Sequence, residues 1–157
     1  MLKIKFLVVD RTRAKFLSDG EVTYLDRLKK YARVEWIEVK PAKIKKGRPE
    51  KDIIAEEALA ITKKLVPHDY LVALDPLGRE YDSEGFSFWL EKLSTSQRGW
   101  INFIIGGPLG LSREIIEQAD DVLSLSRLTF PHEMCRLFLI EQIYRAFTIM
   151  KGTKYHK

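Results

Sequence analysis

The most informative stretch of this chain reads Ile104-Ile105-Gly106-Gly107-Pro108-Leu109-Gly110-Leu111. An apolar run typical of a buried strand passes directly into a glycine-rich turn. In open α/β sheets, ligands bind beyond the carboxyl ends of the strands, where glycines let the backbone approach a ligand closely. The alternative is a tight turn ahead of a helix capped by Ser112. The spacing matches neither the dinucleotide fingerprint nor a P-loop.

Two further stretches have the same character. The stretch Leu125-Ser126-Arg127-Leu128-Thr129-Phe130-Pro131-His132 follows another apolar run and offers hydroxyls from its serine and threonine. Its alternative role is to cap the last helix, with Thr129 at the cap and Pro131 in the first turn. Leu74-Asp75-Pro76-Leu77-Gly78 is a third strand end, where the Asp-Pro pair starts a turn. Three such ends together predict a ligand site.

Apolar runs and helical stretches alternate along the whole chain. We expect strands at Ile4–Val9, Val34–Val39, Tyr70–Leu74, Ile101–Ile105 and Val122–Leu125, and helices at Glu21–Tyr31, Glu50–Leu65, Ser83–Leu93, Ser112–Ala119 and Pro131–Met150. This order predicts an α/β fold with a mostly parallel sheet flanked by helices. Ser18 with Glu21 fits a capping box for the first helix. The length of 157 residues favours one domain spanning residues 1–157.

Composition places the chain among soluble globular proteins, with 45% hydrophobic and 31% charged residues. No apolar run approaches the roughly 20 residues of a membrane span, and the first residues do not resemble a secretory signal. We therefore expect no membrane association. A single cysteine, Cys135, excludes an internal disulfide and suits the reducing cytoplasm. No group of histidines, cysteines and carboxylates has metal-ligand spacing, so we expect no metal.

Basic residues outnumber acidic ones by 27 to 22 and gather in two groups. One group comprises Lys40, Lys43, Lys45, Lys46, Arg48 and Lys51, and the other comprises Lys3, Lys5, Arg11, Arg13 and Lys15. Such groups are either solvated faces or contacts for an anionic partner such as a nucleic acid.

The final helical stretch is apolar around most of its circumference, whereas a surface helix usually shows one apolar stripe. We expect it to be buried on two sides, against its own sheet and against either a two-fold mate or further elements of the same chain. Arg136 and Arg145 are cations in this apolar setting and need partners. Candidates are Glu133, Glu141, a carboxylate of the mate, or RNA phosphate.

The tail Tyr155-His156-Lys157 combines a stacking ring, a titratable imidazole and a cation. Its alternative interpretation is a frayed end. His132 lies in the first turn of the last helix, where packing or substrate contact is expected. We expect His68 to be structural and Cys135 to pack in the apolar helix.

In combination these motifs resemble the ribosomal large-subunit RNA methyltransferase H family, of the SPOUT class. The residues that carry the resemblance are Leu74-Asp75, Ile105-Gly106-Gly107, Leu125 to His132, Glu141-Gln142-x-Tyr144-Arg145-Ala146 and Tyr155-His156-Lys157. The resemblance covers essentially the whole chain. It implies a C-terminal trefoil knot, a homodimer, and S-adenosylmethionine as cofactor. It also implies methylation at N3 of a pseudouridine in the 23S-type rRNA stem-loop that faces the decoding centre of the assembled ribosome.

The resemblance also implies roles for individual residues. The cofactor would be held by Leu74, Gly106, Leu125, Ser126, Arg127, Leu128, Thr129 and Phe130. The tail is implicated in substrate handling across the dimer. We hypothesise that His156 assists loss of the ring proton or positions the base, while Tyr155 stacks and Arg145 or Lys157 holds phosphate. His132 and Arg136 are further candidates for contact with the RNA.

The chain departs from the family at two places. Many members carry Gly-Lys after the first strand, where this chain has Asp10-Arg11, and many have proline where Lys154 precedes the terminal Tyr-His. Two rival functions stay open at this point. One is a non-catalytic ribosome- or RNA-binding protein that uses the basic loop 40–51, and the other is an enzyme acting on a small phosphorylated metabolite at Gly106–Gly110.

Overall fold

A computed structural model describes residues 1–97 and 99–157 and shows one five-stranded sheet. The strands are β1 (Leu2–Val9), β2 (Ala32–Val39), β3 (Tyr70–Arg79), β4 (Ile101–Ile105) and β5 (Asp121–Leu123). They are arranged in the order β2-β1-β4-β3-β5, and each neighbouring pair is parallel. The expected α/β class with a mostly parallel sheet is therefore confirmed.

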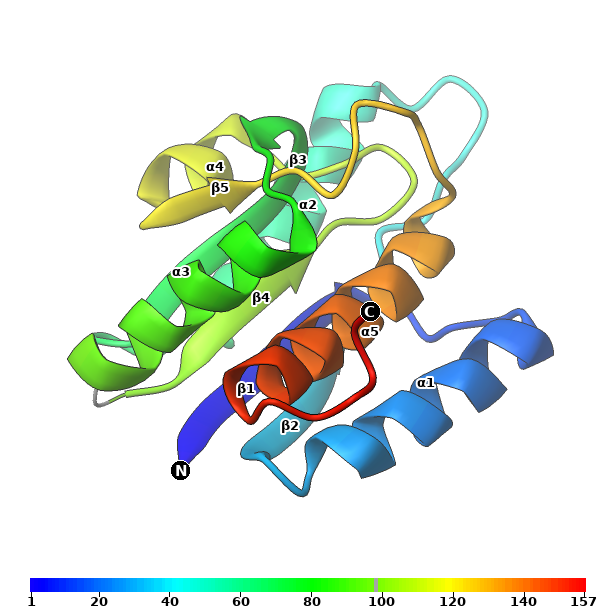
Figure 1. Ribbon diagram of the computed structural model, residues 1–157. Coiled ribbons are helices and arrows are strands. Elements are labelled where there is room, and N and C mark those ends of the chain that lie inside the picture. The colour runs from blue at the N-terminus through cyan, green and yellow to red at the C-terminus, as the bar shows by residue number, and fades with distance from the viewer. Residues whose placement is uncertain (98) are drawn as a thin grey trace.

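Helices cover both faces of the sheet. They are α1 (Lys15–Leu28), α2 (Glu50–Thr62), α3 (Ser83–Ser96), α4 (Arg113–Gln118) and α5 (His132–Met150). On one face α5 packs between α1 and α3, while α2 and α4 lie on the other (Figure 1). Successive side chains of β1 point to opposite faces of the sheet. Phe6 and Val8 belong to the core between the sheet and α5, and Leu7 and Val9 belong to the core on the opposite face.

Several predicted boundaries need correction. Helix α1 begins at Lys15, not at Glu21, and its N-cap Ala14 makes no side-chain capping bond. The predicted capping box is wrong: the Ser18 hydroxyl donates to the Lys15 carbonyl inside the helix, and Glu21 is buried. In contrast, Ser112 caps α4 as expected, because its hydroxyl accepts from the Ile115 amide at 3.2 Å.

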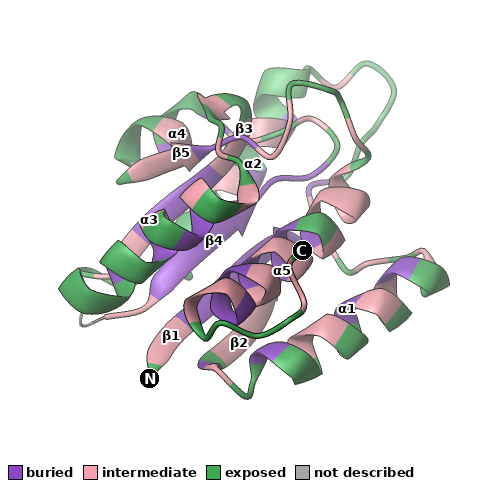
Figure 2. Ribbon diagram, in the orientation of Figure 1, coloured by how far each residue is buried: buried purple, intermediate pink, exposed green. Residues whose placement is uncertain are grey.

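Helix α5 is buried by its own chain along one side, whereas Phe138 is exposed and Met134 and Leu137 are half-buried. Leu139, Ile140 and Ile143 are fully buried within the core that the sheet, α1 and α3 share (Figure 2). The burial of these three residues does not require a second chain, while the side of α5 that carries Phe138 is not covered by its own chain. The homodimer and the trefoil knot stay predictions.

Candidate functional site

A cavity of about 340 Å³ lies at the carboxyl ends of β3 and β4, under the loop that follows β5. We call it the donor cavity. Its lining includes all the predicted cofactor residues except Arg127, namely Leu74, Gly106, Leu125, Ser126, Leu128, Thr129 and Phe130. The three strand ends that the sequence singles out thus converge on one space. Its walls are mainly apolar side chains and exposed backbone.

The glycine turn forms one wall of the donor cavity. The Gly110 amide donates to the Gly107 carbonyl at 3.0 Å, which closes a tight turn. Gly110 has φ of 81°, in the left-handed region that glycine adopts without strain. A Cβ on Gly106 would lie 2.6 Å from the Gly110 carbonyl carbon, so only glycine allows the turn to fold back this closely.

The wall contributed by β3 is an irregularity within the strand. Leu74 and Arg79 both pair with Leu123 of β5, so the residues between them bulge out of the ladder. The Asp75 carboxylate accepts from the Leu77 amide at 2.9 Å and stabilises this excursion. The turn predicted after Leu74 is therefore present, although the strand resumes beyond it.

The third wall is the loop between β5 and α5. The Ser126 hydroxyl accepts from the Leu128 amide at 3.0 Å and holds the loop in a local turn. Arg127 points away and pairs with Glu80 at 3.0 Å. The alternative interpretation, in which this loop caps the last helix with Thr129 at the cap and Pro131 in the first turn, is partly wrong. Thr129 is exposed, and the N-cap of α5 is Pro131.

A second cavity of about 530 Å³ adjoins the donor cavity. Both share the lining residues Leu123, Leu125, Ser126 and Phe130. The far wall of the second cavity comes from the start of α3 and from Phe138, Glu141 and Gln142 of α5.

The predicted catalytic residues gather around Glu141, on the wall of this second cavity. The Glu141 carboxylate accepts from Arg145 at 2.6 Å and from the Tyr155 hydroxyl at 3.1 Å. The Arg145 guanidinium lies 4.8 Å from the Tyr155 ring centroid and 3.2 Å from His156 Nδ1. The tail therefore folds back along α5 of its own chain (Figure 1), with Lys157 exposed at its end.

Neighbouring charges and burial raise the pKa values of two of these groups, Arg145 and Tyr155. The hydrogen bond to Glu141 raises the pKa of Arg145, so that guanidinium is firmly charged. Burial, with the neighbouring Tyr24 and Glu141, raises the pKa of Tyr155, which keeps the phenol protonated. Glu141 was one of the partners that the sequence suggested for Arg145.

His132 lines the donor cavity, in the first turn of α5. Burial lowers the pKa of His132, and the charge of Arg136 lowers it further, so the neutral imidazole is favoured. Cys135 also lines the cavity, and burial raises the pKa of its thiol. His68, expected to be structural, lies in an exposed turn with φ of 74°.

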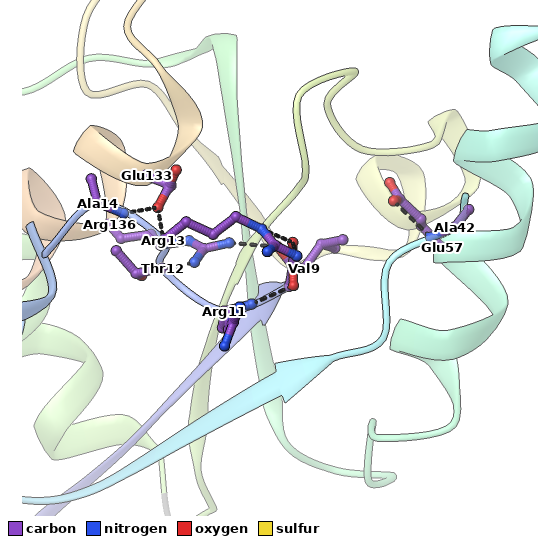
Figure 3. Close-up of polar contacts among 10 residues, drawn as sticks. Val9, Arg11, Thr12, Arg13, Ala14, Ala42, Glu57, Glu133 and Arg136 are labelled. Atoms are coloured by element: carbon purple, nitrogen blue, oxygen red, sulfur yellow. Dashed lines mark hydrogen bonds and ion pairs between the residues drawn. The ribbon is translucent and has the colours of Figure 1, made fainter. Parts of the chain in front are cut away.

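The expected contact between Arg136 and RNA is not compatible with this structure. Arg136 is fully buried, and its guanidinium donates to the Val9 carbonyl at 2.5 Å and to the Thr12 hydroxyl at 2.9 Å (Figure 3). The same hydroxyl donates to Glu21 at 2.6 Å. Arg136 thus connects the turn after β1 to α5 through hydrogen bonds. Because its side chain is buried, it has no access to RNA phosphate. None of the partners suggested from sequence accepts a hydrogen bond from Arg136, although the nearby charge of Glu133 supports the charged guanidinium.

The turn between β1 and α1 contains ordered polar contacts that the sequence did not reveal. Asp10 has φ of 70°, and its carboxylate accepts from the Arg11 amide at 2.8 Å and pairs with the Arg13 guanidinium at 3.0 Å. Although burial acts in the opposite sense, these contacts hold the pKa of Asp10 below its ordinary value. Glu133 of α5 accepts from the amides of Arg13 and Ala14. The departure at Asp10-Arg11 is therefore an ordered turn.

Glu57 of α2 was also missed. It is buried, and its carboxylate accepts from the Ala42 amide at 3.1 Å at the root of the basic loop. Burial raises the pKa of Glu57. The only sign in the sequence is a glutamate among the apolar positions of a helix, which is a weak signal.

The described residues show neither a cluster of potential metal ligands nor a helix that could span a membrane. Across residues 1–97 and 99–157, no three histidine, cysteine or carboxylate side chains come together as a potential metal site. Among the helices of that same part of the chain, none has the length and apolar character to cross a membrane.

The sequence of this chain is similar to those of known methyltransferases over its whole length. A sequence model of the family described as "Predicted SPOUT methyltransferase" matches residues 2–156. A protein of Carboxydothermus hydrogenoformans named ribosomal RNA large subunit methyltransferase H is 39% identical over 160 residues, covering 99% of this chain and 100% of the relative. The protein of the same name from Desulforamulus reducens is 40% identical and is matched over 100% of both chains.

Solved structures show a similar fold. A probable methylase family protein from Haemophilus influenzae superimposes with a TM-score of 0.59 at 12% identity, covering 100% of this chain and 72% of that one. A probable methyltransferase from Bordetella pertussis gives a TM-score of 0.55 at 16% identity, covering 92% of this chain and 96% of that one. At these identities the likeness concerns the fold alone.

Proposed function

The chain belongs to the SPOUT methyltransferase family, and from this premise we propose that it methylates large-subunit ribosomal RNA with S-adenosylmethionine as the methyl donor. The observation that carries the proposal is the whole-length match to relatives named for that activity. The convergence of three strand-end loops on one cavity supports it, because this is where an open α/β sheet holds a ligand.

The donor cavity suits such a cofactor. Leu74, Leu125 and Phe130 offer apolar surface to a purine ring, and the Gly106–Gly110 turn brings backbone groups within reach of polar atoms. When bound, S-adenosylmethionine supplies a methyl group carried on its sulfonium sulfur. The chain contributes binding and placement, and placing two reacting atoms in contact can lower a barrier by about 7–11 kcal/mol. A cavity built from backbone loops, without a nucleophilic triad, fits this role.

On the substrate side, we propose N3 of a pseudouridine as the methyl acceptor, within the stem-loop of the assembled ribosome that the family resemblance implies. The ring nitrogen must lose a proton, and an imidazole can accept one near neutral pH. His156 is the group assigned to this step or to positioning the ring, with Tyr155 stacking on the base. Arg145, held by Glu141, and Lys157 supply cationic contacts.

We also propose that the active form is a homodimer. Within one chain the tail lies on α5 beside the second cavity, and its residues are absent from the described lining of the donor cavity. A tail that reaches the partner's donor cavity would complete the site. The exposed side chains of Leu128 and Phe138, next to the shared wall of the cavities, offer apolar surface for the mate.

The test begins with the donor. Calorimetry with S-adenosylmethionine should show saturable binding, whereas a non-catalytic RNA-binding protein should show no heat. Mass spectrometry of ribosomal RNA should then show one added methyl group after incubation of the protein and donor with ribosomes. Absence of both signals would refute the proposed function.

A variant and a mass measurement test the finer assignments. His156→Ala should bind the donor with unchanged heat and methylate ribosomes at a greatly reduced rate, while full methylation would remove His156 from the mechanism. Sedimentation should give about twice 18.3 kDa. A clean monomer with full activity would refute the shared site.

A further inference from the structure

We propose that the turn after β1 and the loop after β2 together form a rim that binds RNA backbone phosphates beside the donor cavity. The contact residues are Arg11, Lys40, Lys43, Lys45 and Lys46, and we call them the basic rim. The inference rests on the proposed function, since it identifies the surface by which that enzyme holds its RNA.

The two segments leave the sheet side by side. Val9 of β1 is paired with Val39 of β2, and the Asp10 amide donates to the Val39 carbonyl at 2.8 Å. Arg11 and Lys40 therefore follow neighbouring points at the carboxyl edge of the sheet. The basic loop projects from the same end of the molecule as the glycine turn and the loop before α5 (Figure 1).

The cations of the basic rim are free to meet an external anion. All of them are exposed, and within the described part of the chain none has an acidic partner within 4.0 Å. Nearby cations differ, because Arg48 pairs with Glu56 at 2.8 Å and Arg13 pairs with Asp10 at 3.0 Å. The acidic residues closest in the chain are Asp10, which precedes Arg11 and pairs with Arg13, and Glu38, which lies two residues before Lys40.

Two buried charged side chains, Glu57 and Arg136, anchor the rim to the donor cavity (Figure 3). Glu57 accepts from the Ala42 amide at the root of the loop, and a Cβ on Gly107 would lie 3.3 Å from the other oxygen of that carboxylate. One side chain thus bonds to the loop and leaves little space beside the glycine turn. At the other segment, Arg136 and Glu133 fix the turn to α5, whose first turn also lines the cavity.

The chemistry of the basic rim suits phosphate more than bases. Lysines on a loop present point charges that neutralise a nucleic-acid backbone without reading its sequence. Glu57 holds the loop at Ala42, and Arg136 holds the turn after β1 at Val9 and Thr12, so both segments of the rim are held at their bases beside the donor cavity. Phosphates held there would keep a nucleotide of the same strand at the cavity, which is the positioning that methyl transfer needs.

The test compares two quadruple variants. The rim variant carries Lys40→Gln, Lys43→Gln, Lys45→Gln and Lys46→Gln. The control carries Lys30→Gln, Lys63→Gln, Lys64→Gln and Lys151→Gln, which removes the same charge from exposed lysines that follow the carboxyl ends of α1, α2 and α5. Binding of a large-subunit rRNA fragment is measured by fluorescence anisotropy over a range of salt concentrations.

We expect the rim variant to bind the RNA more than about tenfold more weakly at low salt than the wild type, and its salt slope to fall by about 0.7–0.9 for each phosphate that it no longer neutralises. Arg11→Gln alone should lower the slope by the amount expected for about one phosphate. The control should match the wild type. Wild-type affinity and slope in the rim variant would overturn the proposal, as would equal reductions in both variants.

Donor calorimetry separates the two proposals. If the rim variant binds S-adenosylmethionine normally and its RNA binding is unchanged, the basic rim is refuted while the proposed function is untouched. If the wild type binds RNA through the rim but neither binds the donor nor methylates ribosomes, the proposed function fails and the rim stays. Weaker binding of the rim variant to vesicles of phosphatidylserine and phosphatidylcholine, with unchanged binding to RNA, would assign the rim to a membrane and overturn the proposal.

Discussion

At the carboxyl edge of the sheet, the half formed by β3, β4 and β5 differs from the half formed by β1 and β2 in what fixes its loops. On the first half, glycine turns and a strand bulge shape the donor cavity through backbone contacts. On the second half, buried Arg136 and Glu57 tie the loops to helices. One half forms a cavity from backbone, while the other exposes cations above buried charged side chains.

If both proposals hold, one sheet edge serves two kinds of ligand. A small cofactor needs a close-fitting cavity, and glycine provides close approach. A nucleic-acid backbone needs cations at fixed positions, and lysines reach those positions only if the loop beneath them is held. The two halves meet at the start of α5, where His132 lines the cavity and Arg136, one turn later, holds the turn after β1.

The largest expected effect is on stability, from replacing the buried Arg136. Arg136→Met should lower the free energy of unfolding by about 3–5 kcal/mol, because buried Glu21 loses the nearby positive charge and the Val9 carbonyl and Thr12 hydroxyl lose their hydrogen-bond donor. Urea unfolding followed by circular dichroism measures the change. Arg113→Met is the control, since Arg113 is exposed and its pair with Glu117 contributes at most about 0.5 kcal/mol. Equal stability of both variants would contradict the anchoring role.

A smaller effect is expected on the cavity side. Gly106→Ala should cost about 1–3 kcal/mol of stability through the clash with Gly110, and the displaced turn should weaken donor binding at least about tenfold. Calorimetry with S-adenosylmethionine measures the second effect. The comparison variant is Gly110→Ala, where a Cβ meets nothing within 4 Å and only the positive φ is strained. If Gly106→Ala bound the donor normally, the backbone turn would not form the cofactor wall.

The two halves also differ in how far they could be predicted from the sequence. The cavity half rests on local signals: Gly106 follows an apolar run, Ser112 caps the next helix, and Leu74 precedes an Asp-Pro turn. Each signal acts over a few residues, so a single sequence carries it. The predicted parallel sheet was enough to place these loops at one edge, because the carboxyl ends of parallel strands share it, and the structure adds that β4, β3 and β5 are neighbours.

The anchors could not be predicted in this way. Arg136 and its acceptor at Val9 are separated by 127 residues, and Glu133 and Ala14 by 119. No local pattern reports such pairs, so the sequence suggested RNA phosphate for a guanidinium that the fold buries. The start of α1 was missed for a related reason, since Ala14 at the cap carries no polar side chain while Ser18 inside the helix does.

The smallest expected effect is a pH dependence at the point where the halves meet. Burial, aided by the Arg136 charge, holds the pKa of His132 below its ordinary value of 6.5. The unfolded chain therefore binds a proton at a higher pH than the folded chain does, and this histidine makes the folded state less stable as pH falls below 6.5. His132→Gln should remove that contribution. Melting temperatures measured between pH 8 and pH 5 should converge or reverse between wild type and variant as pH falls, whereas a constant difference would show that His132 titrates alike in both states.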